Sequence, residues 1–215
     1  MAESPYFGPA RVARLCLPLH ADEPCGDAAA VFGFDDAPGD VLLALADGLG
    51  HGPHAADAAQ RALQVVAAHK ALPLPQLMSE LDDALRDTRG AAIGLMRVYA
   101  TPERRSLAFA GIGNTRALRW HRQHHYRLPS QYGVVGAGLT WPVAVQVMVL
   151  EPDDWVLMFS DGLDERLTLP LPLPEWERDP QLLCAHLARR WRQGADDIGV
   201  LACHWPLAVA EVGSS

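Results

Sequence analysis

Short apolar runs recur along the chain and are bounded mainly by glycine, proline, aspartate or asparagine. Runs of this kind, about four to eight residues long, are typical of buried strands. They predict strands at 12–17, 29–34, 41–46, 92–99, 106–110, 116–120, 143–150, 155–160 and 198–204. The connection at 101–105 carries a proline and three charged residues between two such runs, and this pattern predicts a hairpin.

Three stretches instead repeat apolar residues at intervals of three and four, the period of an amphipathic helix. They lie at 54–72, 74–88 and 180–193. The first is predicted to bury an alanine-rich face, and the second a stripe of leucine and methionine, with Asp82 on the solvated side. Two helices, then mainly strands, then one helix predict an α+β fold with a sheet-rich core.

Two segments depart from this regular pattern. The stretch 167–177 alternates prolines with leucines, which predicts an extended loop that is either a surface connection or a flap that meets a partner. His121, His124 and His125 lie with Arg119 and other arginines on an apparent hairpin. We interpret that group as a solvated face in preference to a metal site.

Composition narrows the class of protein. The 215 residues are 49% hydrophobic and carry a net charge of −8, and we expect them to form a single globular domain, 1–215. An acidic chain without a lysine or arginine run argues against nucleic-acid and membrane partners. The N-terminus lacks a secretion signal, and no apolar run approaches the ~18 residues of a membrane span. Four scattered cysteines fit a reducing environment, so we expect a cytoplasmic protein.

Acidic residues fall at the ends of the predicted strands. These are Asp27, Asp47, Asp161, Asp196 and Asp197. If the strand ends converge, the cluster must take up protons or bind cations, and all-oxygen ligation favours Mg²⁺ or Mn²⁺ over zinc. Gly48, directly after Asp47, lets the backbone approach an ion closely. The alternative for any single Asp-Gly pair is an ordinary turn.

Taken in order, these and neighbouring residues resemble a known set of motifs. The segments are Gly26-Asp27, 46–53 (ADGLGHGP), 89–95 (RGAAIGL), 111–114 (GIGN), 159–165 (FSDGLDE) and 196–198 (DDI). They resemble the metal-dependent PPM (type 2C) Ser/Thr protein phosphatases, and within them the small bacterial SpoIIE and RsbX group. The resemblance runs from about residue 26 to 203 and implies a β-sandwich flanked by helices, in α-β-β-α layers, with a two-metal centre at one end.

The resemblance also implies roles for single residues. Asp47 would bridge two Mn²⁺ or Mg²⁺ ions, with Asp161 and Asp196 completing one metal and the Gly48 carbonyl ligating the other. Asp27 matches an aspartate near the second metal that often acts through a water. Two such cations activate water and orient the phosphate, so that no protein nucleophile is needed.

Other matches are less complete. Glu165 matches an acidic position that some relatives use for a third, weaker metal, but Asn114 stands where larger relatives carry an aspartate for that site. Gly26 replaces a carboxylate of eukaryotic members. His51 in the glycine loop is either a general acid for the leaving oxygen or a residue that only packs or hydrogen-bonds there.

The expected function is a protein serine/threonine phosphatase in signal transduction. The group that the chain resembles implies a STAS-domain regulator as substrate, in a stressosome or partner-switching system that controls a stress response. One alternative is a non-catalytic PPM-fold module that binds a phosphoprotein or an anti-sigma partner, and another is a small-molecule phosphomonoesterase. The presence of Asp47, Asp161 and Asp196 together favours catalysis, because a scaffold has no need of a repulsive anionic cluster.

Overall fold

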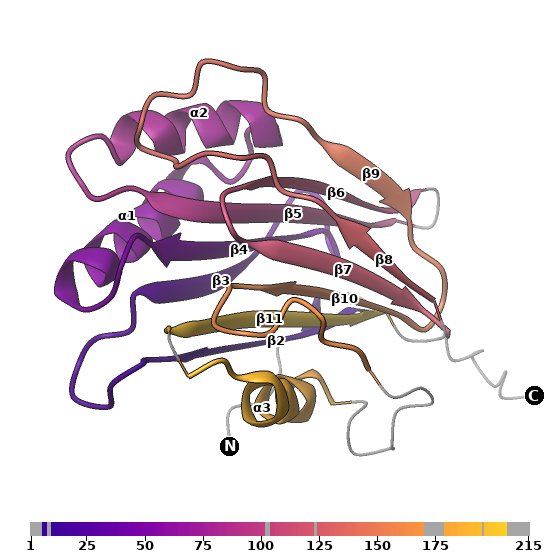
Figure 1. The fold of residues 1–215 in the computed structure, drawn as a ribbon. Coiled ribbons are helices and arrows are strands. Elements are labelled where there is room, and N and C mark those ends of the chain that lie inside the picture. The colour runs from indigo at the N-terminus through magenta and orange to yellow at the C-terminus, as the bar shows by residue number, and fades with distance from the viewer. Residues whose placement is uncertain are drawn as a thin grey trace, which may run out of the picture.

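The computed structural model contains two antiparallel sheets packed face to face, with helices on their outer sides (Figure 1). It describes residues 6–7, 10–101, 104–122, 124–169, 179–194 and 196–205. The sequence-based prediction of an α+β sandwich in α-β-β-α layers is confirmed.

One sheet has six strands in the order β1-β2-β11-β10-β7-β8. Their bounds are β1 (Tyr6–Phe7), β2 (Ala10–Leu17), β7 (Arg116–His121), β8 (His124–Leu128), β10 (Asp154–Phe159) and β11 (Ile198–Trp205). Every residue of the central strands β10 and β11 is buried, because one face packs on the second sheet and the other on a helix.

The second sheet has five strands in the order β3-β4-β5-β6-β9. They are β3 (Asp27–Gly33), β4 (Val41–Gly48), β5 (Ala91–Thr101), β6 (Arg104–Ile112) and β9 (Gln146–Val149). The predicted hairpin is confirmed, since β5 and β6 pair antiparallel up to Thr101 and Arg104. Strand β9 covers only part of the predicted run 143–150.

The described residues include three helices. Helices α1 (Pro53–His69) and α2 (Leu74–Ala84) cover the five-stranded sheet, and α3 (Pro180–Trp191) covers the other (Figure 1). Proline occupies the first turn of each, where a missing N–H leaves no bond unmade. Among these residues no helix is both long and apolar enough to cross a membrane.

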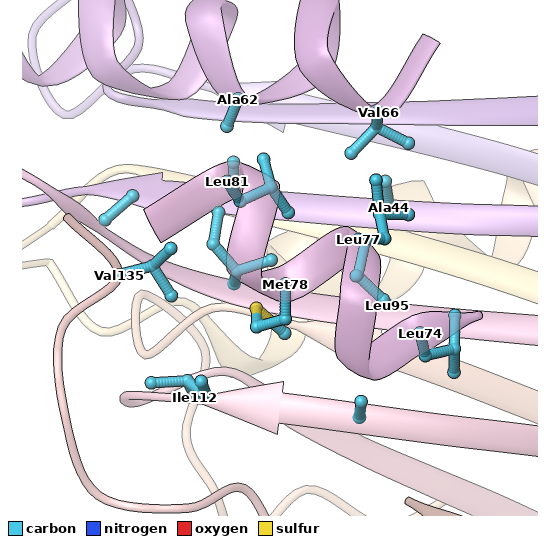
Figure 2. Packing of buried hydrophobic residues seen from close by; sticks show 14 of the residues in the cluster. Ala44, Ala62, Val66, Leu74, Leu77, Met78, Leu81, Leu95, Ile112 and Val135 are labelled. Atoms are coloured by element: carbon cyan, nitrogen blue, oxygen red, sulfur yellow. The ribbon is translucent and has the colours of Figure 1, made fainter. Parts of the chain in front are cut away.

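The core lies on both faces of β4. Ala44 of this strand, with Leu95 of β5, faces Ala62 and Val66 of α1 and the leucine stripe of α2 (Figure 2). Neighbouring Leu43 faces the other sheet. A strand that alternates between two apolar layers reads as a continuous apolar run, which explains why 41–46 is so uniformly hydrophobic.

The second helix differs from its prediction in two ways. It ends at Ala84 instead of 88, and Asp82 is 4% exposed instead of solvated. The Asp82 carboxylate accepts backbone N–H bonds from Gly136, Gly138 and Leu139 at 2.7–3.2 Å. Asp82 therefore holds the connection between β8 and β9 against the helix, a role that helical periodicity does not reveal.

The histidine-bearing hairpin forms as β7 and β8, but its predicted solvated face is only partly correct. His124 and His125 are exposed. Arg119 is 7% exposed and donates from Nε to Asp154 Oδ2 at 2.7 Å, and His121 Nδ1 lies 2.8 Å from Asp154 Oδ1. The prediction was wrong for Arg119 and His121 because their acidic partner lies more than 30 residues away in sequence.

The proline-rich stretch 167–177 is described only at its start. Leu167 and Leu169 are buried in the core beneath α3, without helix or strand structure. The flap alternative concerns residues 170–178, which lie outside the described part of the chain.

Candidate metal centre

Two aspartates face each other at one end of the five-stranded sheet. Asp27 begins β3, Asp47 lies near the end of β4, and the two are directly paired in the antiparallel register. Opposed residues of such a pair project from the same face with Cβ atoms about 5 Å apart. Their exposed fractions are 4% and 9%, and neither forms a salt bridge among the described residues. The fold therefore places two carboxylates side by side in a nearly buried position.

The other sheet adds carboxylates at the same end of the sandwich. Asp161 follows the last strand residue of β10 by two positions, and Asp196 precedes β11 by two. Ser160 links the two sheets, because its hydroxyl donates to Asp27 Oδ2 at 2.6 Å and accepts from Gly199 N at 2.8 Å. Ser160 belongs to the sequence motif at 159–165, but that motif predicts no role for its side chain.

The carboxylates strongly influence one another. The pKa of Asp47 is raised to about 9, first by burial and then by the charges on Asp27, Asp161 and Asp196. The pKa of Asp27 is raised to about 7, again chiefly by burial, although the Ser160 hydroxyl opposes the rise. Burial also raises the pKa of Asp196. The structure thus pairs Asp27 with Asp47 and brings Asp161 and Asp196 within electrostatic range of them, while the role of the four as metal ligands stays a prediction.

Asn114 lies between two of these carboxylates. Its Nδ2 donates to Asp161 Oδ2 at 2.6 Å, and a hydrogen bond from the same side chain lowers the pKa of Asp47. Its Oδ1 is buried and has no hydrogen-bond partner among the described residues. A buried amide oxygen that lacks a hydrogen-bond partner can ligate a hard cation, or it can accept a hydrogen bond from a water bound to that cation.

The donor set fits a hard divalent cation. It consists of carboxylate and amide oxygens, is largely buried, and lacks a neutralising side chain within the described ranges. Over those same ranges no three acidic, histidine or cysteine side chains are grouped closely enough to form a metal site. Metal binding by these carboxylates stays a prediction.

Gly48 is required by packing. A Cβ at this position would lie 2.0 Å from the carbonyl oxygen of Ala55 in α1, and the Gly48 N–H donates to Gly26 O at 3.0 Å. The expectation that glycine serves a close approach to an ion therefore has a competing structural reason. The Gly48 carbonyl as a ligand stays a prediction from the resemblance.

Glu165 has a cationic partner of its own. Its Oε2 lies 3.6 Å from Arg116 Nη2, and it lines a cavity of about 530 Å³ together with Asp161. The predicted third site therefore lies next to the carboxylate cluster, but its acidic residue is already paired with an arginine. Its metal-binding role stays a prediction.

His51 and Asp197 lie at the edge of the cluster in the loops around it. The His51 side chain is 57% exposed, and its Nδ1 is 3.1 Å from Glu23 Oε2. Asp197 accepts backbone N–H bonds from Leu19 at 2.5 Å and Gly26 at 2.6 Å, so both of its oxygens are occupied. Asp197 therefore fixes the loop that contains Leu19 and Gly26. The sequence pattern groups Asp197 with Asp196 and does not predict this contact. It also does not predict the contact between Glu23 and His51.

A larger cavity opens beside the carboxylates. Its volume is about 580 Å³, and Leu49 and Asn114 connect it to the cluster. Its lining is mainly apolar, with Arg116 and Arg127 and the almost fully exposed Tyr132. The cavity can accommodate several side chains of a bound polypeptide.

Comparison with known proteins agrees with this arrangement. The family model described as Stage II sporulation protein E (SpoIIE) matches residues 37–206. No curated protein sequence matches the chain. A chain solved in work on the bacterial stressosome is 24% identical, with a TM-score of 0.78, covering 90% of this chain and 98% of that chain.

Two further solved structures share the fold. RsbX in complex with magnesium is 16% identical, with a TM-score of 0.72 and coverage of 91% of this chain and 94% of that chain. The PP2C phosphatase domain of SpoIIE from Bacillus subtilis, solved with a fragment of its regulatory domain, is 16% identical, with a TM-score of 0.73 and coverage of 91% and 63%. At these identities the likeness establishes the fold.

Proposed function

Because this chain belongs to the SpoIIE family of PPM-type phosphatases, we propose that it is a metal-dependent protein serine/threonine phosphatase. One observation carries the proposal: aspartates from both sheets converge at one end of the sandwich without a neutralising side chain among the described residues. Burying several carboxylates together opposes folding, because the charges repel one another and lose their hydration. Such a cluster is expected where a bound cation offsets that cost.

The proposed metal ligands follow from the resemblance and from the placement of the side chains. Asp47 would be shared by two Mg²⁺ or Mn²⁺ ions, Asp161 and Asp196 would complete one ion, and Asp27 and the Gly48 carbonyl would serve the other. When bound, these ions supply the positive charge that acidifies water and neutralises the phosphate. Ser160 fixes Asp27 by its 2.6 Å hydrogen bond, and Asn114 fixes Asp161 by another.

His51 is the proposed proton donor to the leaving serine or threonine oxygen. It is the exposed imidazole of the loop that follows Asp47, and its charge reaches Asp196 of the cluster. An alkoxide leaving group needs a proton as its bond to phosphorus breaks, and histidine can supply one near neutral pH.

The proposed substrate is a phosphorylated protein. The 580 Å³ cavity lies beside the carboxylates, and Arg127 brings positive charge to it in addition to the Arg116–Glu165 pair, in an otherwise acidic molecule. We propose a STAS-domain regulator as the target, in line with the stressosome neighbour and with a similar structure of the RsbU and RsbW domains of Rv1364c from Mycobacterium tuberculosis.

Hydrolysis of p-nitrophenyl phosphate with EDTA, Mg²⁺ or Mn²⁺ tests the proposal. We expect turnover that needs the metal and falls by about 10³-fold in Asp47→Asn and in Asp161→Asn. Asp57→Asn, an exposed position on α1, is the matched control and should keep full activity. A folded wild-type protein without turnover in either metal would instead favour the non-catalytic module that binds a phosphoprotein.

A further inference from the structure

We propose that Glu23 is the positioning residue that orients His51 for proton transfer to the leaving oxygen. This inference rests on the proposed phosphatase function and adds a residue that lies outside the sequence motifs. Glu23 belongs to the loop between β2 and β3, 28 residues before His51.

The contact itself is specific. His51 Nδ1 lies 3.1 Å from Glu23 Oε2, which is hydrogen-bond distance. A Cβ at Gly52 would lie 3.3 Å from the same Glu23 oxygen, and Gly52 has a φ of +75°. A glycine beside His51 therefore gives the carboxylate close access and provides the left-handed backbone that the loop needs.

The loop that carries Glu23 is anchored to the carboxylate cluster. Asp197 accepts the N–H of Leu19 at 2.5 Å and the N–H of Gly26 at 2.6 Å, on either side of Glu23. The Glu23 N–H in turn donates to His20 O at 3.1 Å and closes a tight turn. Asp197 follows Asp196 directly, so one short segment both contributes to the cluster and fixes the loop that presents Glu23.

The charged groups around His51 favour one orientation. The ionised Glu23 carboxylate can only accept a hydrogen bond, so it favours a proton on Nδ1 and leaves Nε2 as the nitrogen that exchanges a proton. Burial raises the pKa of Asp196, and a positive charge on His51 would partly oppose that rise, which places the ring within electrostatic range of the cluster. The His20 ring meets the His51 ring edge-on, with the centroids 6.2 Å apart. Arg89 is a further charged group near this loop, because its Nη1 lies 3.1 Å from a Cβ built at Gly50, the residue before His51.

The proton transfer balances without a further reactant. Hydrolysis joins a water oxygen to phosphorus and breaks the bond between phosphorus and the serine oxygen. The serine oxygen leaves with that electron pair and takes the proton from His51 Nε2. The attacking water releases a proton to solvent, from which His51 is reprotonated. Glu23 stays ionised throughout, holds the ring through Nδ1, and stabilises its protonated form.

Two substrates with different leaving groups separate this role from a structural one. We expect Glu23→Gln to lower kcat for a phosphoserine peptide by about 10- to 100-fold. The same variant should change p-nitrophenyl phosphate turnover by less than about twofold, because nitrophenolate leaves without a proton. Asp22→Asn, which removes a charge from the same loop, is the control and should change neither rate.

The NMR signals of the ring nitrogens provide a readout that needs neither metal nor turnover. In the metal-free protein with a neutral ring, we expect His51 to carry its proton on Nδ1 in the wild type and in Asp22→Asn, and to shift toward the Nε2-protonated tautomer in Glu23→Gln. Equal losses on both substrates, or a His51 tautomer unchanged by Glu23→Gln, would overturn the inference. A wild-type protein inactive on both substrates would instead overturn the phosphatase function, and with it any catalytic role for the pair.

Discussion

Strand β10 carries acidic residues at both ends, and the fold treats the two ends in opposite ways. At its start Asp154 is fully buried and accepts from Arg119 Nε at 2.7 Å and from the Glu151 N–H at 2.7 Å, with His121 Nδ1 at 2.8 Å. Beyond its other end the cluster around Asp47 has no such cation in the described residues.

The surroundings of a buried carboxylate distinguish a structural role from a binding role. The chain surrounds Asp154 with positive charge and N–H donors, as a structural acid requires. The same strand leads into a cluster in which burial and neighbouring carboxylates raise the pKa values of Asp27 and Asp47. We therefore expect a bound cation to supply the positive charge that the described side chains do not provide there.

The largest expected effect is at the start of β10, where Asp154 has cationic partners. Asp154→Asn should lower the free energy of unfolding by about 3–5 kcal/mol, because the buried Arg119 would lose its fully buried partner and keep only the half-exposed Glu151 carboxylate at 3.2 Å. Urea unfolding followed by circular dichroism measures the change, with exposed Asp83→Asn as the control. A loss below about 1 kcal/mol would mean that the two ends do not differ as described.

An aspartate-to-asparagine substitution beyond the other end of β10, in the carboxylate cluster, should instead raise the free energy of unfolding. At pH 8 folding forces the Asp47 carboxyl to take up a proton that it loses in the unfolded chain, and asparagine avoids this cost, so we expect metal-free Asp47→Asn to gain about 2 kcal/mol. For a chain of this size the gain corresponds to roughly 4–8 °C in Tm. Thermal unfolding in EDTA tests this, and a lower Tm for the variant would contradict the idea of an uncompensated cluster.

Stability of the metal-free protein should fall as the pH rises. The folded pKa values of Asp27 and Asp47, about 7 and about 9, lie above the ordinary value of 3.8, so the folded state holds protons that the unfolded chain releases. Stability is complete below about pH 4 for these two groups and is lost progressively up to about pH 9. Urea unfolding in EDTA at several pH values measures the slope.

A cation should remove much of that slope. Metal binding replaces the protons on the carboxylates, so the stabilisation by Mn²⁺ should increase with pH. Asp47→Asn should lose the part of the slope between about pH 7 and pH 9, which Asp47 alone contributes, and most of the Mn²⁺ effect. A stabilisation by Mn²⁺ that is independent of pH and retained in Asp47→Asn would place the bound ion elsewhere.

The two ends also differ in how well the sequence predicts them. The acidic motif after the run 41–46 and the motif around Asp161 pointed to a shared cleft, because a strand end is a rigid and recognisable place for a carboxylate. The buried face of α1 was predicted correctly for the same reason, since one helical period fixes which alanines turn inward.

Contacts made by single side chains across long separations were not predictable. Asp154 and Arg119 are 35 residues apart, and no periodicity around Arg119 marks a charged residue as buried, although the inner residues of β7 all are. Glu23 lies in a loop without periodicity, and its contact with His51 depends on a loop anchored by Asp197, 171 residues from Gly26. Only the assembled sandwich brings these residues together.

The smallest expected effect concerns Asn114, which donates to Asp161 at 2.6 Å. Asn114→Asp replaces that donor with another negative charge, so we expect the metal-free protein to lose about 1 kcal/mol. The added carboxylate should tighten Mn²⁺ binding severalfold, as isothermal titration calorimetry would measure, because a hard cation gains a charged oxygen ligand. Asn114→Ser, which adds no charge, should not tighten binding. Weaker binding in Asn114→Asp would mean that Asn114 acts as a donor to Asp161 that a metal-loaded centre also needs.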